Sequence, residues 1–199
     1  MNELLQLQQK ISKYAAAFSG VFTLSDLKNL IAAKNSVHFY RQLKRLEDSQ
    51  ILFSFVRGIY VTPQFKLDVV SQKLCAQSYI SLASVLAQNL MIGTVPRNTV
   101  YAVKLGKSRT YESRFGTIVH LGLTPKLFFG FHKIQGVNWA EPEKAFLDTL
   151  YFYQKGFKLY FNIYDDLNAT DLNRKKIMTY LKNYKNPRFK KFVERKLHG

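Results

Sequence analysis

The chain has few acidic residues for its length, and its charge is strongly one-sided. Its 199 residues include 13 Asp and Glu against 30 Lys and Arg, which gives a formal net charge of +17. A charge of that sign favours polyanions, an anionic surface or an acidic protein as partners, and says nothing about the fold. Nucleic acid is the partner that such an excess most often indicates.

Cysteine and long apolar runs are also scarce. The single cysteine, Cys75, excludes an internal disulfide and a cysteine-based zinc site within one chain. No stretch approaches the ~20 apolar residues that a membrane-spanning helix needs. The first residues, MNELLQLQQK, lack the basic start and apolar run of a secretory signal. We therefore expect a soluble, cytoplasmic protein without a membrane partner, and an apolar content of 47% predicts a packed core.

The first 65 residues have the pattern of helix, helix, tight turn, helix and hairpin. Apolar spacing predicts a first helix over about residues 2–18, which Gly20 ends. Thr23, followed three residues later by Asp26, is typical of a capped start for a second helix that runs to about residue 33. Ser36 is the candidate N-cap of the third helix.

The third helix, SVHFYRQLKRL, is amphipathic and basic. Phe39, Leu43 and Leu46 share one side at helical spacing, and the basic residues leave that side. The following segment, ILFSFVRGIYV, predicts two short strands joined by a turn at Arg57 and Gly58. This order of elements matches a winged helix-turn-helix, whose third helix enters the major groove of DNA. A small helical domain that binds protein is the alternative.

We expect DNA contacts at the start of the third helix, along its exposed side and at the tip of the hairpin. Free N–H groups at a helix start can hold a phosphate, and Arg or Gln side chains can pair with guanine or adenine. Tyr60 is expected in the core, and Tyr40 in either place. The expected DNA-binding set is Ser36, His38, Arg41, Gln42, Lys44, Arg45 and Arg57.

The remainder predicts a linker helix over 66–77 and a mixed α/β domain over 78–199. We expect a helix that Ser81 caps and Gly93 ends, a turn over 94–98, and then a strand. GKSRTYESRFG reads as a hairpin loop, and GTIVHLGL and KLFFGF as strands. EPEKAFLDTLYFY predicts a helix with Pro142 in its first turn. Its Lys144 and Asp148 are spaced to pair at i,i+4 on the side away from the core.

The last 29 residues, 171–199, predict two amphipathic, basic helices. Between residues 174 and 199 there are ten Lys and Arg, at positions 174, 175, 176, 182, 185, 188, 190, 191, 195 and 196, and one acid, Glu194. Interspersed apolar residues predict that these helices dock on the body and present a basic surface, which would add salt-dependent DNA affinity. That surface is expected to include Arg174, Lys175, Lys176, Lys182, Arg188, Lys190 and Lys191. The fold class predicted for the whole chain is thus α+β.

Three stretches resemble the AbiEi-type antitoxins of type IV abortive-infection toxin–antitoxin pairs. The segment ending FVRGIYV is similar to that family's winged helix. YISLASVLAQNLMIG is similar to the start of its second domain, and AEPEKAFLDTLYF to its Pro-Glu-Lys-Ala segment. The resemblance spans most of residues 10–155 and leaves the basic tail unassigned.

The resemblance implies a transcriptional repressor in a phage-defence system. Such a protein binds its own operator DNA, as a monomer or a dimer, and counteracts a nucleotidyltransferase-like toxin with or without direct contact. A stand-alone winged-helix regulator without a toxin is the alternative. No cofactor is implied.

Catalysis and metal binding find little support in the sequence. Glu141, Glu143 and Lys144 are reminiscent of a nuclease Glu-x-Lys motif, but Lys144 follows the glutamates by three residues and by one, never by two. The histidines, at 38, 120, 132 and 198, do not show metal-binding spacing. We expect no enzyme, and a metal ion held by Asp148 and these glutamates would contradict that expectation.

Overall fold

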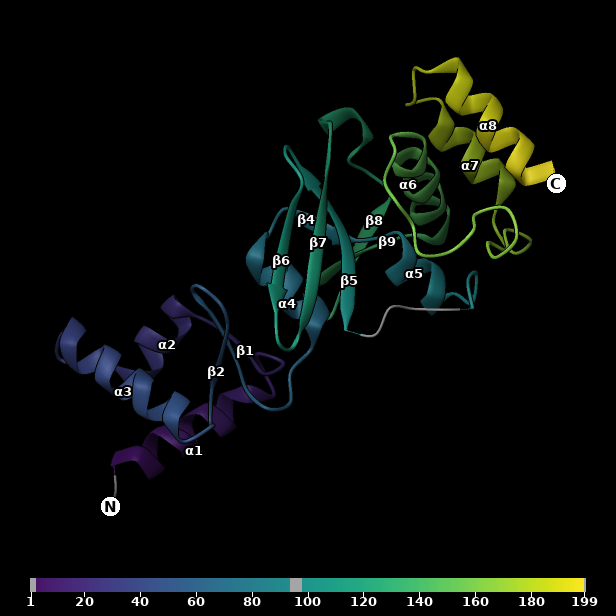
Figure 1. Ribbon diagram of the computed structural model, residues 1–199. Helices are drawn as coiled ribbons and strands as arrows, with labels where there is room; N and C mark the ends of the chain where they lie inside the picture. Colours follow the sequence, from purple (N-terminus) through teal and green to yellow (C-terminus); the bar gives the residue numbers. More distant parts are fainter. Residues whose placement is uncertain (1–2, 94–97, 199) are drawn as a thin grey trace.

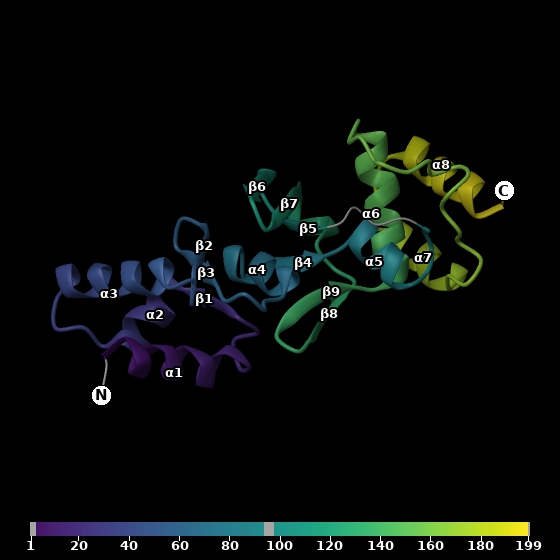
Figure 2. The ribbon, with the colours of Figure 1, turned by 60° about the horizontal axis from the view of Figure 1, so that its bottom comes forward.

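The predicted α+β fold class is confirmed, and the strands form two separate sheets. The computed structural model describes residues 3–93 and 98–198. An N-terminal unit of helices and a three-stranded sheet is followed by a larger unit built on a six-stranded sheet. In both ribbon views α3 (Ser36–Asp48) and α8 (Pro187–His198) lie at opposite ends of an elongated molecule (Figures 1 and 2).

The N-terminal unit has the predicted order of elements. The chain runs through α1 (Glu3–Ala15), β1 (Val21–Thr23), α2 (Leu24–Ile31), α3, β2 (Phe53–Val56) and β3 (Ile59–Val61). The strands pair antiparallel in the order β1-β3-β2. The three helices and the sheet enclose a core whose buried members are Leu7, Ile11, Phe22, Leu27, Ile31, Phe39, Leu43, Leu46 and Leu52.

Local side-chain chemistry explains where these helices begin. The predicted capping box of α2 is confirmed, because the Thr23 hydroxyl accepts from the Asp26 N–H at 3.1 Å and the Asp26 carboxylate accepts from the Thr23 N–H at 2.8 Å. The predicted Ser36 cap of α3 is wrong. Asn35 is the cap, since its side-chain oxygen accepts from the His38 N–H at 2.8 Å.

Both expected helix ends in this unit come earlier than predicted. The regular part of α1 stops at Ala15, and the predicted residue 2 lies outside the described residues. Helix α2 stops at Ile31 because Ala32 takes a left-handed conformation at φ 49°. Gly20 has φ +72°, and a Cβ there would lie 2.1 Å from the Gln64 carbonyl oxygen. Only glycine therefore fits where the chain turns into β1.

Helix α4 (Leu67–Leu74), which is shorter than the predicted 66–77, joins the two units. It packs between the small sheet and the large one, with Val70 fully buried. The cluster around it takes Val21 and Val61 from the first unit and Ile118 from the second. The units are thus connected through a shared apolar core as well as through the chain.

The larger sheet has six strands in the order β6-β7-β5-β4-β9-β8. Their bounds are β4 (Ser78–Ile80), β5 (Thr99–Leu105), β6 (Arg109–Ser113), β7 (Gly116–Leu123), β8 (Phe131–Ile134) and β9 (Val137–Ala140). Strands β5 and β7 are parallel, as are β4 and β9, and the other neighbours are antiparallel.

Two predictions for this sheet are wrong, one of a loop and one of a strand. The expected hairpin loop at 106–116 contains strand β6, whose polar residues suit an exposed sheet edge paired with β7. The expected strand KLFFGF is instead a 3-10 turn at Pro125–Leu127 followed by a loop, and only Phe131 begins a strand. The turn expected over 94–98 cannot be compared, because residues 94–97 lie outside the described residues.

Helices cover both faces of the large sheet. Alternation along β7 places Ile118 and His120 toward α4, and Val119 and Leu121 toward the main core. That core includes α5 (Ala83–Gln88), α6 (Pro142–Gln154), α7 (Arg174–Leu181) and α8. The predicted docking of the two tail helices is confirmed, since Ile177, Leu181, Phe189, Val193 and Leu197 are buried in this core.

A charged network lies at the centre of this core. Lys144 and Asp148 form the predicted i,i+4 pair, but both side chains are 0% exposed, so the expectation that they lie away from the core is wrong. Asp148 also accepts hydrogen bonds from Tyr79 at 3.0 Å and from Ser81 at 2.8 Å. Ser81 therefore does not cap α5 as predicted, and Leu82 precedes that helix without a side-chain cap.

Burial lowers the pKa of Lys144 and raises that of Asp148, and their mutual contact opposes both shifts. Aromatic rings surround the ammonium group, with the Phe129 centroid at 5.0 Å and the Tyr79 centroid at 5.7 Å. The Lys144 amine also donates to the Tyr184 hydroxyl at 3.4 Å, which links α6 to the segment between α7 and α8. The charge on each side chain is compensated inside the protein.

A first prediction concerns this pair. Lys144→Met should lower the free energy of unfolding by about 3–5 kcal/mol, because it leaves the Asp148 carboxylate buried without its cation. Urea denaturation measures the loss. Lys144→Met/Asp148→Asn removes both charges and should recover a large part of the stability, and a double variant no more stable than the single one would contradict this account.

A second prediction concerns His120, which is fully buried and shares a hydrogen bond of 2.8 Å with Ser71 of α4. Burial, aided by the charge of Lys104, lowers its pKa from 6.5 to about 4. The unfolded chain therefore binds a proton at a higher pH than the folded chain does. His120 should remove about 3 kcal/mol of stability as the pH falls from 6.5 to 4.

Because carboxylates titrate in the same range, the measurement is a difference between two proteins. Unfolding free energies of wild type and His120→Gln should converge as the pH falls from 7 to 4, since glutamine keeps a partner for Ser71 and does not titrate. Parallel pH profiles would show that His120 does not cause the loss.

Candidate nucleic-acid interface

Helix α3 has two polar sides, and one of them is free. Val37, Tyr40, Arg41 and Lys44 recur at i, i+3, i+4 and i+7, and all four are exposed. Val37 is 81% and Tyr40 52% exposed, which is high for apolar and aromatic side chains. None of the ion pairs found among residues 3–93 and 98–198 includes Arg41 or Lys44. This side offers two cations and two bulky contact groups to a partner.

The other polar side of α3 faces the start of α1. His38, Gln42 and Arg45 recur at i, i+4 and i+7, and Gln42 is only 1% exposed. Its amide nitrogen lies 2.9 Å from the His38 ring, and its amide oxygen accepts from Arg45 at 3.3 Å. The expectation that Gln42 lies on the exposed face with the arginines is therefore wrong, because its position on the helix turns it toward α1.

Glu3 completes this second side. Its carboxylate lies 3.2 Å from the Arg45 guanidinium and 3.4 Å from the His38 ring. The hydrogen bond from Gln42, together with the charges of His38 and Arg45, lowers the pKa of Glu3. Two of the expected base-reading residues, His38 and Arg45, are thus engaged within the chain, although both remain partly exposed.

The predicted basic turn of the hairpin is present. Arg57 is exposed between β2 and β3, and Gly58 follows it with φ +87°. The Gly58 carbonyl accepts from the Leu24 N–H at 2.9 Å, which ties this turn to the start of α2. Tyr60 is partly buried against the N-terminal core, as predicted.

Four of the seven expected DNA-binding residues are therefore exposed and outside the Glu3 network: Ser36, Arg41, Lys44 and Arg57. The sequence analysis did not place Val37 on this exposed side and left Tyr40 undecided. Their spacing with Arg41 and Lys44 is the signal that would have joined them to the same side.

Five of the seven expected basic residues of the tail are exposed, and two are not. Lys176 lies 3.1 Å from the Glu141 carboxylate and 3.3 Å from that of Glu143 at the start of α6, so the expectation that it belongs to a free basic surface is wrong. Lys190 is half-buried. The exposed members of the expected set are Arg174, Lys175, Lys182, Arg188 and Lys191.

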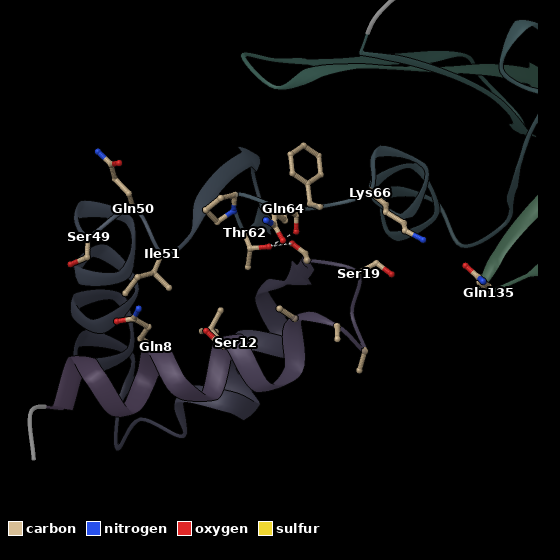
Figure 3. A pocket seen from close by; sticks show the side chains of 17 residues that line it. Gln8, Ser12, Ser19, Ser49, Gln50, Ile51, Thr62, Gln64, Lys66 and Gln135 are labelled. Atoms are coloured by element: carbon tan, nitrogen blue, oxygen red, sulfur yellow. Dashed lines mark hydrogen bonds between the residues drawn. The ribbon is translucent and has the colours of Figure 1, made fainter. Parts of the chain in front are cut away.

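A shallow groove of about 1120 Å³ lies beside the N-terminal unit but differs from these surfaces in charge. Figure 3 shows Gln8 and Ser12 rising into it from α1, with Gln50 and Ile51 on one side and Lys66 on the other. Among the lining residues only Lys66 is charged. The groove therefore lacks the cations that a phosphate backbone needs.

Two features relevant to catalysis can be assessed in the described residues. No group of three or more His, Cys, Asp or Glu in that part of the chain could hold a metal ion. Lys144 and Asp148 are 0% exposed, so a substrate cannot reach them. No helix among residues 3–93 and 98–198 is both long enough and apolar enough to cross a membrane.

Two comparisons with known proteins returned no match. No model of a known protein family matches the chain, and no curated protein matches it at a significant level.

A third prediction follows from the Glu3 network. Glu3→Gln removes the carboxylate that holds His38 and Arg45, so a phosphate can pair with Arg45 without displacing it. We expect duplex DNA to bind a few-fold more tightly, because an exposed ion pair contributes only weakly to stability. Fluorescence anisotropy with a labelled duplex measures the change, and Glu112→Gln, a neutralised acid on β6 of the larger sheet, is the charge-matched control. Equal gains in both variants would mean that only net charge matters.

Proposed function

We propose that this protein is a DNA-binding repressor of the antitoxin type, whose N-terminal unit acts as a winged helix-turn-helix. The observation that carries the proposal is the free side of α3, where Arg41 and Lys44 stand beside Val37 and Tyr40. An arginine there can pair with guanine in the major groove, and an apolar side chain such as Val37 can contact a thymine methyl group.

The rest of the unit supports this reading. The start of α3 is exposed at Ser36 and Val37, and the Asn35 side chain accepts only from the His38 N–H, so the earlier N–H groups of this turn can bind a phosphate. Arg57 at the hairpin turn provides a further cation for backbone or minor groove. The formal charge of +17 gives a general attraction to DNA that weakens with salt.

The antitoxin role depends on the resemblance of three segments to the AbiEi type. Two of these segments meet in the fold, since Tyr79 and Ser81 from one bond to Asp148 from the other. On this proposal the protein represses its own operon and counteracts a nucleotidyltransferase-like toxin encoded beside it. A regulator without a toxin shares the same DNA-binding surface.

A fourth prediction tests DNA binding. Arg41→Ala/Lys44→Ala should weaken binding to a duplex from the chain's own upstream region by about ten- to a hundred-fold, through loss of one base contact and one phosphate contact. Gel shift or anisotropy at fixed salt measures it. Lys107→Ala/Lys133→Ala removes two exposed cations of the larger unit and should have little effect. Unchanged binding by the α3 variant would show that another surface reads the DNA.

The two functional alternatives separate in a growth assay. Co-expression with the adjacent open reading frame should rescue growth if that frame encodes a toxin. Failure to rescue, with DNA binding intact, would favour the stand-alone regulator.

A further inference from the structure

The outer face of α8 and the end of α6 form a basic hollow with aromatic walls. Tyr153, Gln154, Arg188, Lys191, Phe192 and Arg195 line a volume of about 360 Å³. The three cations stand at i, i+3 and i+7 of α8, so they share one side of the helix. We call this hollow the α6–α8 site.

The two aromatic rings of this hollow are aligned, and Tyr153 is exposed while Phe192 is partly buried against the main core. The Tyr153 and Phe192 rings are nearly parallel, with an angle of 17° and centroids 6.2 Å apart. Tyr164 meets Tyr153 edge-on at 6.5 Å. Tyr153 is 39% and Tyr164 59% exposed. Two exposed tyrosine rings beside a partly buried phenylalanine are suited to a planar or apolar contact group in a partner.

The cations of the α6–α8 site are not neutralised by the protein. No ion pair among residues 3–93 and 98–198 includes Arg188, Lys191 or Arg195, whereas Lys176 on the neighbouring α7 is paired with two glutamates. Keeping three like charges on one helix side costs electrostatic energy, which an anionic partner would relieve.

We propose that the α6–α8 site binds single-stranded RNA. Rings that stack unpaired bases, beside cations that follow the phosphates, are the two components of single-strand recognition. A duplex does not offer its base faces to Tyr153 and Phe192, and an acidic peptide has no planar group for them. RNA is the abundant single-stranded nucleic acid of a cell, so it is the occupant to which we commit.

This function is separate from the proposed repressor activity. The α6–α8 site lies at the end of the molecule opposite α3 in both ribbon views (Figures 1 and 2), so one ligand need not displace the other. Failure of DNA binding at α3 therefore leaves the RNA proposal intact, and the reverse also holds.

Anisotropy with a labelled single-stranded 12-nucleotide RNA of mixed sequence tests the proposal on the full chain. Tyr153→Leu should weaken binding about ten-fold through the loss of one stacking contact, and Tyr153→Phe should restore it. Arg188→Gln/Arg195→Gln should lower the slope of log affinity against log salt by about 1.4. Thermal unfolding confirms that each variant folds.

The control for charge is Lys107→Gln/Lys133→Gln, which loses two cations elsewhere and should keep most of the RNA affinity. The same oligonucleotide as a duplex should bind more weakly and should not respond to Tyr153→Leu. The proposal is overturned if Tyr153→Leu binds the single strand as wild type does, if both double variants lose affinity equally, or if oligoglutamate competes as well as RNA. Single-stranded DNA that binds more tightly than RNA would also overturn it.

Discussion

The larger unit depends on one buried ion pair, Lys144 with Asp148. Both charges have left water completely, which is favourable only if every polar atom around them has a partner. Tyr79 of β4 and Ser81, which directly follows that strand, donate hydrogen bonds to the carboxylate, and Tyr184 of the tail contacts the ammonium. The network therefore fixes the position of α6 against the sheet and of the tail against α6. An apolar core alone would tolerate small shifts in both, whereas these hydrogen bonds hold only in one arrangement.

The sequence predicts most of the N-terminal unit because its signals are local. Thr23 and Asp26 predict the start of a helix, Gly20 predicts a turn, and Arg57–Gly58 predicts a hairpin. Each of these signals acts within a few residues. The larger unit is harder to predict, because its arrangement depends on contacts between distant residues. Asp148 bonds to residues 67 and 69 positions away, and β6 exists only because β7 pairs with it. No local pattern distinguishes such a strand from a polar loop.

The candidate interface shows the same division. The sequence predicts that α3 is amphipathic, and its apolar side is buried as predicted. The sequence does not predict which polar side of α3 remains free. That depends on the contact of Arg45 with Glu3, which lies 42 residues earlier in the chain. His38 and Arg45 lie on the side of α3 that faces α1, whereas Arg41 and Lys44 lie on the other side. Tertiary contact thus decides which polar residues of α3 remain exposed, and the helix defines only the candidates.

The net charge of +17 does not act on a bound ligand as a whole, because only the cations close to that ligand attract it. At physiological salt the attraction of an exposed cation fades over about 8 Å. The tail cations lie beyond the larger sheet from α3 in both ribbon views, and the shared core around α4 holds the two units together (Figures 1 and 2). They therefore add little to a phosphate bound at α3 unless the duplex runs along the long axis of the molecule. A basic, aromatic surface so placed is better explained by a ligand of its own than by reinforcement of the DNA contact.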